Sequence, residues 1–289
     1  MVIAAFFVCH WVLAVFFQSF FHHRYGAHRM FTMSRGWERF FYLAAYVTQG
    51  SSFLDPTGYG ILHRLHHAFS DGARDPHSPQ NHPNVWAMMW ATKYEYDRYA
   101  HHGELPEARF LGGLPSWPAL DRIGQSWVSR VAFMGLYVWF YAAFATAWWQ
   151  FLLLPVHFMM GPVHGAIVNW CGHRYGYRNF SLADQSRNSL IVDLVCAGEL
   201  YQNNHHKYSM SPDFAARWFE FDTTYAVMRV FAWLGIIEFG AHTQRMRLTE
   251  RAIARAGEAG VAQACATMPS IDDSPVAVLV DEPVATSDL

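Results

Sequence analysis

Charged side chains are scarce in this sequence. Asp, Glu, Lys and Arg make up 15% of its 289 residues, and 52% of the residues are hydrophobic. Soluble proteins carry about 25% charged residues, so the composition predicts a chain that lies largely in a membrane. The formal net charge of −2 shows no excess of basic residues, which excludes a nucleic-acid-binding surface as the main function.

Cysteine is scarce as well. The four cysteines lie far apart and form no C-x-x-C pair: Cys9, Cys171, Cys196 and Cys265. This spacing excludes a disulfide framework and indicates a reducing compartment. Histidine, in contrast, is abundant, because its 17 residues nearly equal the 21 Lys and Arg residues together.

Two long stretches contain no Asp, Glu, Lys or Arg, namely residues 1–21 and 131–173. About 20 apolar residues cross a bilayer as a helix, and the first stretch lacks the basic start and the cleavage site of a signal peptide. We expect one span near 1–21 and two more near 131–151 and 154–172. Residues 40–54 are too short to cross and are expected to form a half-embedded helix.

The expected second and third spans form a hairpin that turns near Pro155, so residues 22–130 and 173–289 lie on one face of the membrane. All 21 Lys and Arg residues lie on that face, and the positive-inside rule makes it cytoplasmic. We expect a bacterial inner membrane. Three spans is an odd number, and a missing N-terminal helix would restore an even one.

The chain is expected to divide into a large membrane part and a polar end. Residues 1–245 are predicted to form one all-α membrane domain, a transmembrane helical bundle with a cytosolic helical cap. The pattern of residues 246–264 predicts a polar surface helix. Residues 265–289 contain acidic but no basic side chains, which is typical of a disordered tail.

Histidines recur with the same spacing in two distant segments, HRLHH and QNNHH. On a helix each segment brings three side chains within an arc of about 100°: His63, His66 and His67 in the first, and Gln202, His205 and His206 in the second. Two such helix faces, turned toward each other, would gather six side chains in a small volume.

Two further pairs stand near the span ends, His23 and His28 in HHRYGAH and Asn169 and His173 in NWCGH. A lone histidine at a membrane surface is most often an interfacial polar residue, but all these groups on one membrane face predict a metal site. Eight histidines exceed the needs of one ion, so two ions are expected, and imidazole suits Zn, Cu, Fe and Ni. An imidazole-rich site beside lipid indicates oxidation with dioxygen, since acyl C–H bonds carry no acidic proton for a base to remove.

These motifs resemble a known family. HRYGAH, HRLHH and QNNHH, separated by a hydrophobic hairpin, are similar to the three histidine boxes of integral-membrane fatty acid desaturases, most closely the acyl-CoA (stearoyl-type, delta-9) branch. SDGARDPHSP, NWCGHRYGYRNF and GELYQNNHH look like the same family, and the resemblance covers about residues 10–240. It implies a helical membrane enzyme with two iron ions that uses O2 to introduce a cis double bond into a long-chain acyl group.

The resemblance also implies the metal ligands: His23, His28, His63, His66, His67, His173, His205 and His206. Asn169 corresponds to an asparagine that reaches iron through water. Gln202 stands where the acyl-CoA branch usually has histidine, and it either coordinates, binds through water or leaves a position open for oxygen. No catalytic residue is expected apart from the ligands.

Other polar residues near the boxes have two interpretations. Glu199, Asp75 and Asp193 are candidates to orient ligand imidazoles, or they are ordinary surface carboxylates. Arg64 and Lys207 would meet an acyl headgroup or the donor protein, or they face phosphate at the membrane surface.

The acyl carrier and the electron source follow from what is missing. Ile61 and Leu62 occupy the positions of an Arg-Asp pair that helps to seat CoA in animal enzymes, so CoA, carrier protein and phospholipid all stay open. The sequence contains no His-Pro-Gly-Gly motif of a fused cytochrome b5. We therefore expect a separate donor of the ferredoxin, rubredoxin or cytochrome b5 type, with its reductase.

Two other functions are compatible with the residues. A membrane hydroxylase of the alkane, sterol or carotenoid type uses similar boxes and returns a hydroxyl group to the substrate. A non-enzymatic haem or metal-handling protein would use histidines inside the spans. Lipid analysis distinguishes the first alternative, and a haem absorption band or the absence of iron would indicate the second.

Overall fold

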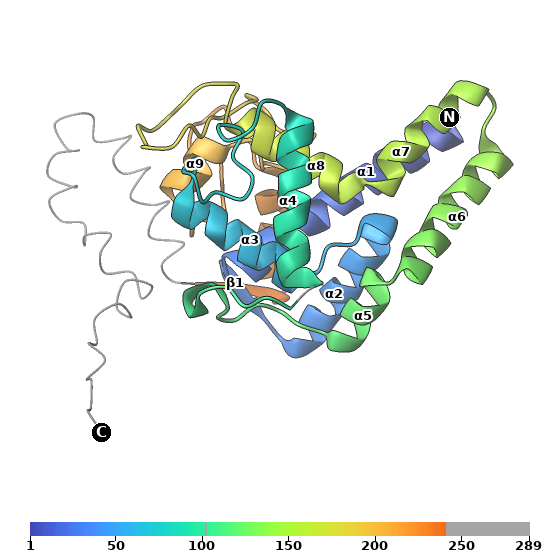
Figure 1. Ribbon diagram of the computed structural model, residues 1–289, viewed down its shortest axis with the longest axis horizontal. Helices are drawn as coiled ribbons and strands as arrows, with labels where there is room; N and C mark the ends of the chain where they lie inside the picture. The colour runs from blue at the N-terminus through green and yellow to red at the C-terminus, as the bar shows by residue number, and fades with distance from the viewer. Residues whose placement is uncertain (102, 241–289) are drawn as a thin grey trace, which may run out of the picture. The chain divides into compact units, whose positions relative to one another are not determined.

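The computed structural model describes residues 1–101 and 103–240 (Figure 1). Helices dominate them, as expected. The strands in this part of the chain are β1 (Phe31–Met33) and β2 (Ile237–Phe239), which pair antiparallel with Phe31 opposite Phe239. The predicted surface helix 246–264 and tail 265–289 lie outside the described residues.

The first apolar stretch is a single rod of two helix types. α1 (Val2–Phe17) continues directly into a π-helix, η1 (Gln18–Ala27). Together they form 26 residues that are long and apolar enough to cross a membrane. The helix therefore ends at Ala27 and not near residue 21, because the π-helical turns carry the chain through the first histidine motif.

The hairpin differs from the one expected. α6 (Trp127–Phe144) is the second helix with the length and composition of a span, and it ends at Phe144 rather than near residue 151. Residues Trp148–Phe158 and Met160–Gly172 are bent by 74° at their break, so the described residues hold two candidate spans, or three if this pair is one.

Two prolines explain the broken helix in place of a straight span at 154–172. Pro155 stands in the first turn of α7 (Leu154–Phe158), which follows η4 (Trp148–Leu153). Pro162 stands in the first turn of α8 (Met160–Gly172). Proline lacks an N–H and is tolerated only at helix starts, so each proline begins a new helix instead of continuing the last one.

The expected half-embedded helix 40–54 is shifted toward the N-terminus. α2 spans Arg35–Gln49, because Ser34 caps its start by accepting a hydrogen bond from Trp37 N, and a short 3-10 turn, η2 (Gly50–Ser52), follows it. α2 buries Phe41 on one face and leaves apolar side chains such as Phe40 and Val47 about half exposed on the other. An exposed apolar face of this kind is typical of a helix that lies against lipid.

The remaining elements form the cap around the histidines. They are α3 (Pro56–Phe69), α4 (Val85–Ala100), η3 (Ala108–Phe110), α5 (Pro118–Gln125), α9 (Gln202–Lys207) and α10 (Thr223–Trp233). α3 packs against η1 and α4. In Figure 1, α6, α7 and the N-terminus of α1 lie at one end of this part of the molecule, and α3 and α9 lie at the other.

Candidate metal centre

The π-helix brings the first histidine pair together. Five residues subtend about 140° on an α-helix, which would turn His23 and His28 apart. A π-helix instead bonds each N–H to the carbonyl five residues earlier, and His28 N donates to His23 O at 3.0 Å. The two ring centroids are consequently 5.0 Å apart.

The second motif lies on a helix, as its spacing predicts. Asp55 caps α3 by accepting a hydrogen bond from Gly58 N at 2.7 Å, and Pro56 begins the helix. The three histidines of HRLHH occupy its last turns, where His63 and His67 face the η1 histidines. The short helix α9 (Gln202–Lys207) carries His205 and His206.

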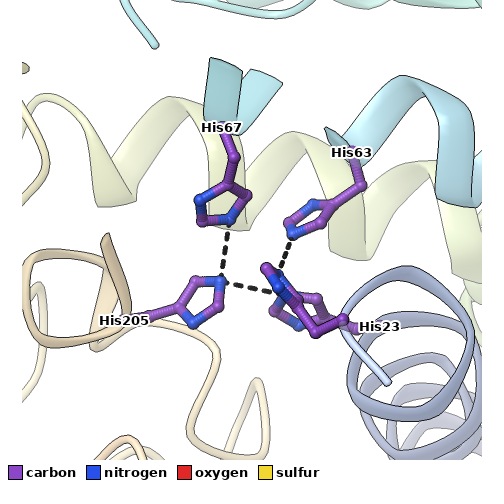
Figure 2. A group of neighbouring side chains, drawn as sticks. His23, His63, His67 and His205 are labelled. Carbon is purple, nitrogen blue, oxygen red and sulfur yellow. Dashed lines mark hydrogen bonds between the residues drawn. The ribbon is translucent and has the colours of Figure 1, made fainter. Parts of the chain in front are cut away.

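Five of the predicted histidines form a first cluster: His23, His28, His63, His67 and His205, with ligand nitrogens within 4.8 Å of one another. Nε2 of His28 lies 2.7 Å from Nε2 of His63, and Nε2 of His67 lies 2.9 Å from Nε2 of His205. Figure 2 shows four of these rings turned toward one common space. Three separate segments, η1, α3 and α9, therefore build one imidazole cage.

The other three predicted histidines form a second cluster. His66, His173 and His206 have ligand nitrogens within 4.8 Å of one another, and Nε2 of His66 lies 3.2 Å from Nε2 of His206. The His67 and His206 ring centroids are 4.7 Å apart, so the two clusters adjoin. His66 also groups with Asp75 and His77.

Carboxylates contact four of the eight histidines at Nδ1, the ring nitrogen next to the Cβ-bearing carbon Cγ. Each Nδ1 lies close to one carboxylate oxygen: His23 to Glu199 at 2.5 Å, His66 to Asp75 at 2.9 Å, His173 to Asp71 at 2.8 Å and His206 to Asp184 at 2.9 Å. Sequence reasoning named Glu199 and Asp75 and missed Asp71 and Asp184. The missed pair lies in loops without helical spacing, so only their carboxyl chemistry and nearness in sequence to the histidine motifs offered any signal.

These carboxylates are ionised. Burial alone would raise the pKa of Glu199, but His23 and Arg24 lower it to about 2. Burial likewise opposes ionisation of Asp71, Asp75 and Asp184, yet their histidine partners hold each pKa below its ordinary value. An ionised carboxylate only accepts hydrogen bonds, so Nδ1 of His66, His173 and His206 donates to its aspartate.

This tautomer makes both clusters suitable for metal. With Nδ1 protonated, Nε2 is the nitrogen of His66 and of His206 that remains for a metal, and the two Nε2 atoms lie 3.2 Å apart, where one proton bridges them while His66 is protonated. Nε2 of His173 is buried and has no hydrogen-bond partner among the described residues. A metal ion that displaces this proton would be bound by the converging Nε2 atoms, because neutral imidazole is the form that binds metal.

The electrostatics of the two clusters differ. Burial, followed by the neighbouring histidines, holds the pKa of His63 and His205 well below the ordinary value. Burial lowers the pKa of His206 to about 4 against the opposing effect of Asp184. Burial also acts on His66, but Asp75 outweighs it and leaves the pKa of His66 raised. Three of these four histidines are therefore neutral at neutral pH.

Gln202 lies close to Gly172, the residue before His173. Gln202 is buried, its Nε2 donates to Glu199 O at 2.7 Å, and a Cβ on Gly172 would come within 2.5 Å of its Cγ. The carbonyl oxygen is thus the atom of Gln202 that is left for a metal. Asn169 lies one turn before His173 on α8, and its water-mediated role stays a prediction.

Asp193 does not orient a histidine. Its carboxylate accepts hydrogen bonds from three backbone N–H groups of its own loop, those of Cys196, Gly198 and Leu200, at 2.8, 3.1 and 2.9 Å. Within residues 1–101 and 103–240 it makes no hydrogen bond to a histidine. The tight turn before Glu199 needs an acceptor for these donors, and Asp193 supplies it.

Arg64 is also occupied by the fold. Its guanidinium donates to the carbonyl oxygens of Ala27 at 2.8 Å, Phe110 at 3.0 Å and Gly112 at 2.8 Å. It therefore ties the end of η1 to the chain after η3 instead of facing a headgroup. Lys207 is half-buried, with Nζ 5.9 Å from the Tyr208 ring centre, and its contact with a headgroup stays a prediction.

A surface hollow of about 280 Å³ borders the second cluster. It is lined by Gln80, His173, Arg174, Tyr175, Gln185 and Arg187, and this lining contains no carboxylate. The His173 side chain is fully buried, so the hollow ends against the shell of the cluster and does not open onto its centre.

Comparison with known proteins gives one consistent result. The fatty acid desaturase family model matches residues 1–238. The chain is 30% identical over 244 residues to the Delta-9 desaturase-like 5 protein of Arabidopsis thaliana, which covers 80% of this chain and 75% of that protein. It is 29% identical over 233 residues to the Acyl-CoA 5-desaturase AL21 of Anemone leveillei, an alignment that covers 78% of this chain and 67% of that protein. It is 27% identical over 217 residues to the sn-1 stearoyl-lipid 9-desaturase of Anabaena variabilis, with 74% of each chain covered.

Proposed function

The chain belongs to the fatty acid desaturase family and is a fatty acyl desaturase, and from this premise we propose that it uses two iron ions and O2 to introduce a cis double bond, at the delta-9 position, into a long-chain acyl group. Its apolar helices and its family make it an integral membrane protein. Family membership removes the non-enzymatic alternative.

The observation that carries the proposal is the pair of adjoining histidine clusters, whose ring nitrogens converge. The first iron would be held by the five histidines of the first cluster, and the second by His66, His173 and His206. The carbonyl oxygen of Gln202, and Asn169 through water, would complete the second set. Iron with dioxygen supplies the oxidising power that an unactivated acyl C–H bond requires, which acid–base groups do not.

The protein's own side chains orient and protect this centre. Asp71, Asp75, Asp184 and Glu199 fix the tautomers and ring planes of their histidines, which raises the ligands' basicity. Most ligand rings are buried, so bulk water is excluded from the space where they converge. Because the lone-pair nitrogens are committed to metal, the histidines do not serve as acids or bases.

The two positions that help to bind CoA in animal enzymes carry no charged side chain here. Ile61 and Leu62 are buried, and Ile61 packs with Leu65 and Phe110. The relatives include both an acyl-CoA and a stearoyl-lipid desaturase by name. CoA, carrier protein and phospholipid are accordingly the three carriers that a substrate assay must compare.

Electrons would come from a separate donor of the ferredoxin, rubredoxin or cytochrome b5 type, on the cytoplasmic face of a bacterial inner membrane. We place its approach at the hollow beside His173, where Arg174 and Arg187 offer two guanidinium groups and the lining has no carboxylate. An acyl headgroup bound there would bring its first carbons to the metal instead of the middle of the chain. The hollow therefore suits an acidic protein donor better than a substrate headgroup.

Fatty-acid profiling tests the reaction. The chain is expressed in a host that lacks this activity, and total fatty acids are analysed by gas chromatography with mass spectrometry. A new unsaturated acid with a cis bond at carbon 9, absent from cells that express His67→Ala, would support the proposal. A hydroxylated product would identify the hydroxylase alternative, and an unchanged profile alongside well-folded, iron-loaded protein would contradict desaturation.

A further inference from the structure

The segment between α8 and α9 exposes an unusual run of aliphatic side chains. Their exposed fractions are Leu190 38%, Ile191 62%, Val192 47%, Leu194 64% and Val195 52%. The polar residue within the run, Asp193, is fully buried. The topology expected from the sequence places this whole region in water, where so many adjacent exposed aliphatic groups are unfavourable.

Key polar groups in this run are bonded within the protein. The Asp193 carboxylate accepts three backbone N–H groups, and Asp193 N donates to the Tyr201 hydroxyl at 3.2 Å. Ile191 O accepts from the same hydroxyl at 2.9 Å, and Val195 O accepts from the Trp11 indole at 2.8 Å. Because these groups are bonded internally, the loop carries fewer free polar groups, which lowers the cost of bringing its aliphatic side chains into contact with lipid.

Contacts with two helices indicate independently how deep the loop lies. Trp11, which holds Val195, lies six residues before the end of α1, or about 9 Å at 1.5 Å per residue, before η1 is counted. On the other side, Cys196 and Leu200 pack with Val168 of α8. The chain thus leaves α8 at the metal-bearing end, runs back beside both apolar helices and then returns to α9.

We propose that residues 190–195 form a loop that lies at the boundary between headgroups and hydrocarbon on the metal-bearing side, with its aliphatic side chains in contact with lipid acyl chains. The loop is continuous with the lipid-facing side of α1, where Val8 and Val12, which flank Trp11, are 57% and 51% exposed. A protein partner would be expected to meet aromatic or arginine side chains at such a surface, and the run has neither.

The loop leads directly into the metal centre. Ala197 and Gly198 have positive φ angles of 57° and 90°, and a Cβ on Gly198 would come within 2.6 Å of Asp222 Oδ1. This tight turn is followed by Glu199, which holds His23, and then by α9. Lipid contact at 190–195 would therefore set the depth at which α9 presents its histidines.

Spin-label accessibility tests the proposal without metal or substrate. In a variant with all four cysteines replaced by alanine, Ile191→Cys and Leu194→Cys are labelled with a nitroxide and reconstituted in phosphatidylcholine–phosphatidylglycerol vesicles. Collisions with O2, which concentrates in hydrocarbon, are compared with collisions with a water-soluble nickel chelate. Trp218→Cys is the matched control, because Trp218 is 95% exposed in the chain between α9 and α10.

Labels at 191 and 194 are expected to collide several-fold more often with O2 than with the nickel chelate, and the label at 218 should show the reverse. Equal chelate access at 191, 194 and 218 would overturn the proposal and place the loop in water. Protection from both reagents would also overturn it, since a second copy or another protein would then cover the loop. Labelled variants that elute as wild type in gel filtration are the ones compared.

Discussion

The two histidine clusters are built in different ways. The first gathers five imidazoles, and the one carboxylate close behind them is Glu199 on His23 among the described residues. The second gathers three imidazoles, and a separate aspartate holds each one. The first cluster has more imidazoles, whereas the second has a carboxylate in contact with each of its imidazoles.

This difference predicts that the two metal positions differ in how readily they exchange ligands. A metal surrounded by five imidazoles has few positions left for another ligand. The second metal would have fewer protein ligands, and it lies beside the hollow with Arg174 and Arg187. We therefore expect the second position to be the more exchangeable of the two, and the following experiments break or sharpen that contrast.

Removal of a first-cluster ligand is expected to have the largest effect. His67 faces His205 at 2.9 Å, and its ring lies 4.7 Å from that of His206 in the second cluster. His67→Ala should lower product formation by more than about 100-fold, beyond the loss typical of an outer-shell change, and iron per chain should fall. His101→Ala, an exposed histidine of the cap, should change neither, and full activity of His67→Ala would contradict the ligand assignment.

Loss of an outer-shell aspartate should weaken the second cluster selectively. Asp184→Asn removes the charge that holds Nδ1 of His206, and such changes cost about 10–100-fold in metal affinity or activity. Iron titration should show one weakened site and one unchanged site. Asp97→Asn is the matched control, because Asp97 holds His101 at 3.0 Å in the same way at the surface. Equal weakening of both sites would show that the clusters do not act separately.

Charge reversal at the hollow should slow electron delivery without affecting the chemistry. The double variant Arg174→Glu with Arg187→Glu should lower turnover driven by an acidic donor protein by about tenfold or more, because electrostatic steering is lost. Turnover driven by dithionite should stay at the wild-type rate. Arg109→Glu reverses an exposed arginine that pairs with Glu107 elsewhere on the surface and serves as the control. A matching loss with dithionite would count against the docking site.

Replacement of the amide neighbour should make the second metal less exchangeable. Gln202→His supplies an imidazole in place of a carbonyl oxygen, which is a weaker ligand for iron. Iron loss to a chelator should become several-fold slower for one of the two sites. Gln185→His adds an imidazole in the hollow, outside the cluster, and should leave the rate unchanged. An unaltered rate in Gln202→His would mean that residue 202 does not reach the metal.

Acid should release metal from the two clusters in order. Burial lowers the pKa of His66, but Asp75 raises it further, to above the ordinary 6.5, so protons compete with metal there near neutrality. Burial and neighbouring histidines hold the pKa of His28 and His205 well below 6.5, so the first cluster needs stronger acid.

The sign of the stability effect follows from the same shift. In the metal-free protein, protonated His66 stabilises the fold below pH 6.5, and this contribution is lost as pH rises through the raised pKa. Because the second cluster takes up protons at a higher pH than the first, the iron retained after gel filtration should fall in two steps as the pH is lowered from about 7.5 to about 5. A single step would show that the difference between the clusters does not control metal loss.

Local spacing was enough to predict that the histidines of these motifs lie close together. The HRLHH segment lies on a helix as its periodicity indicates, and the eight predicted histidines divide into two clusters without any left over. Glu199 and Asp75 also lie where a supporting role requires. The helical character followed from composition, because apolar stretches without charge have few other stable forms in a membrane.

Other features depended on contacts between distant segments. The π-helix at 18–27 has no periodic signal, yet it turns His23 and His28 to the same side. Asp71 and Asp184 come from loops, while Asp193 and Arg64 form hydrogen bonds with backbone groups instead of with a histidine or a headgroup. The break before α8 follows from prolines that the sequence shows, but its angle of 74° was hidden, because the angle depends on what packs beside it.

The sequence by itself determined the histidine motifs, their helical spacing and the apolar stretches, because these follow from side-chain chemistry and the geometry of a single helix. Only the tertiary structure decided which histidines share a cluster, which carboxylates hold them and how the loop before α9 packs on α1. Those outcomes depend on hydrogen bonds between residues as far apart as Asp71 and His173 or Trp11 and Val195, and local spacing carries no information about such pairs.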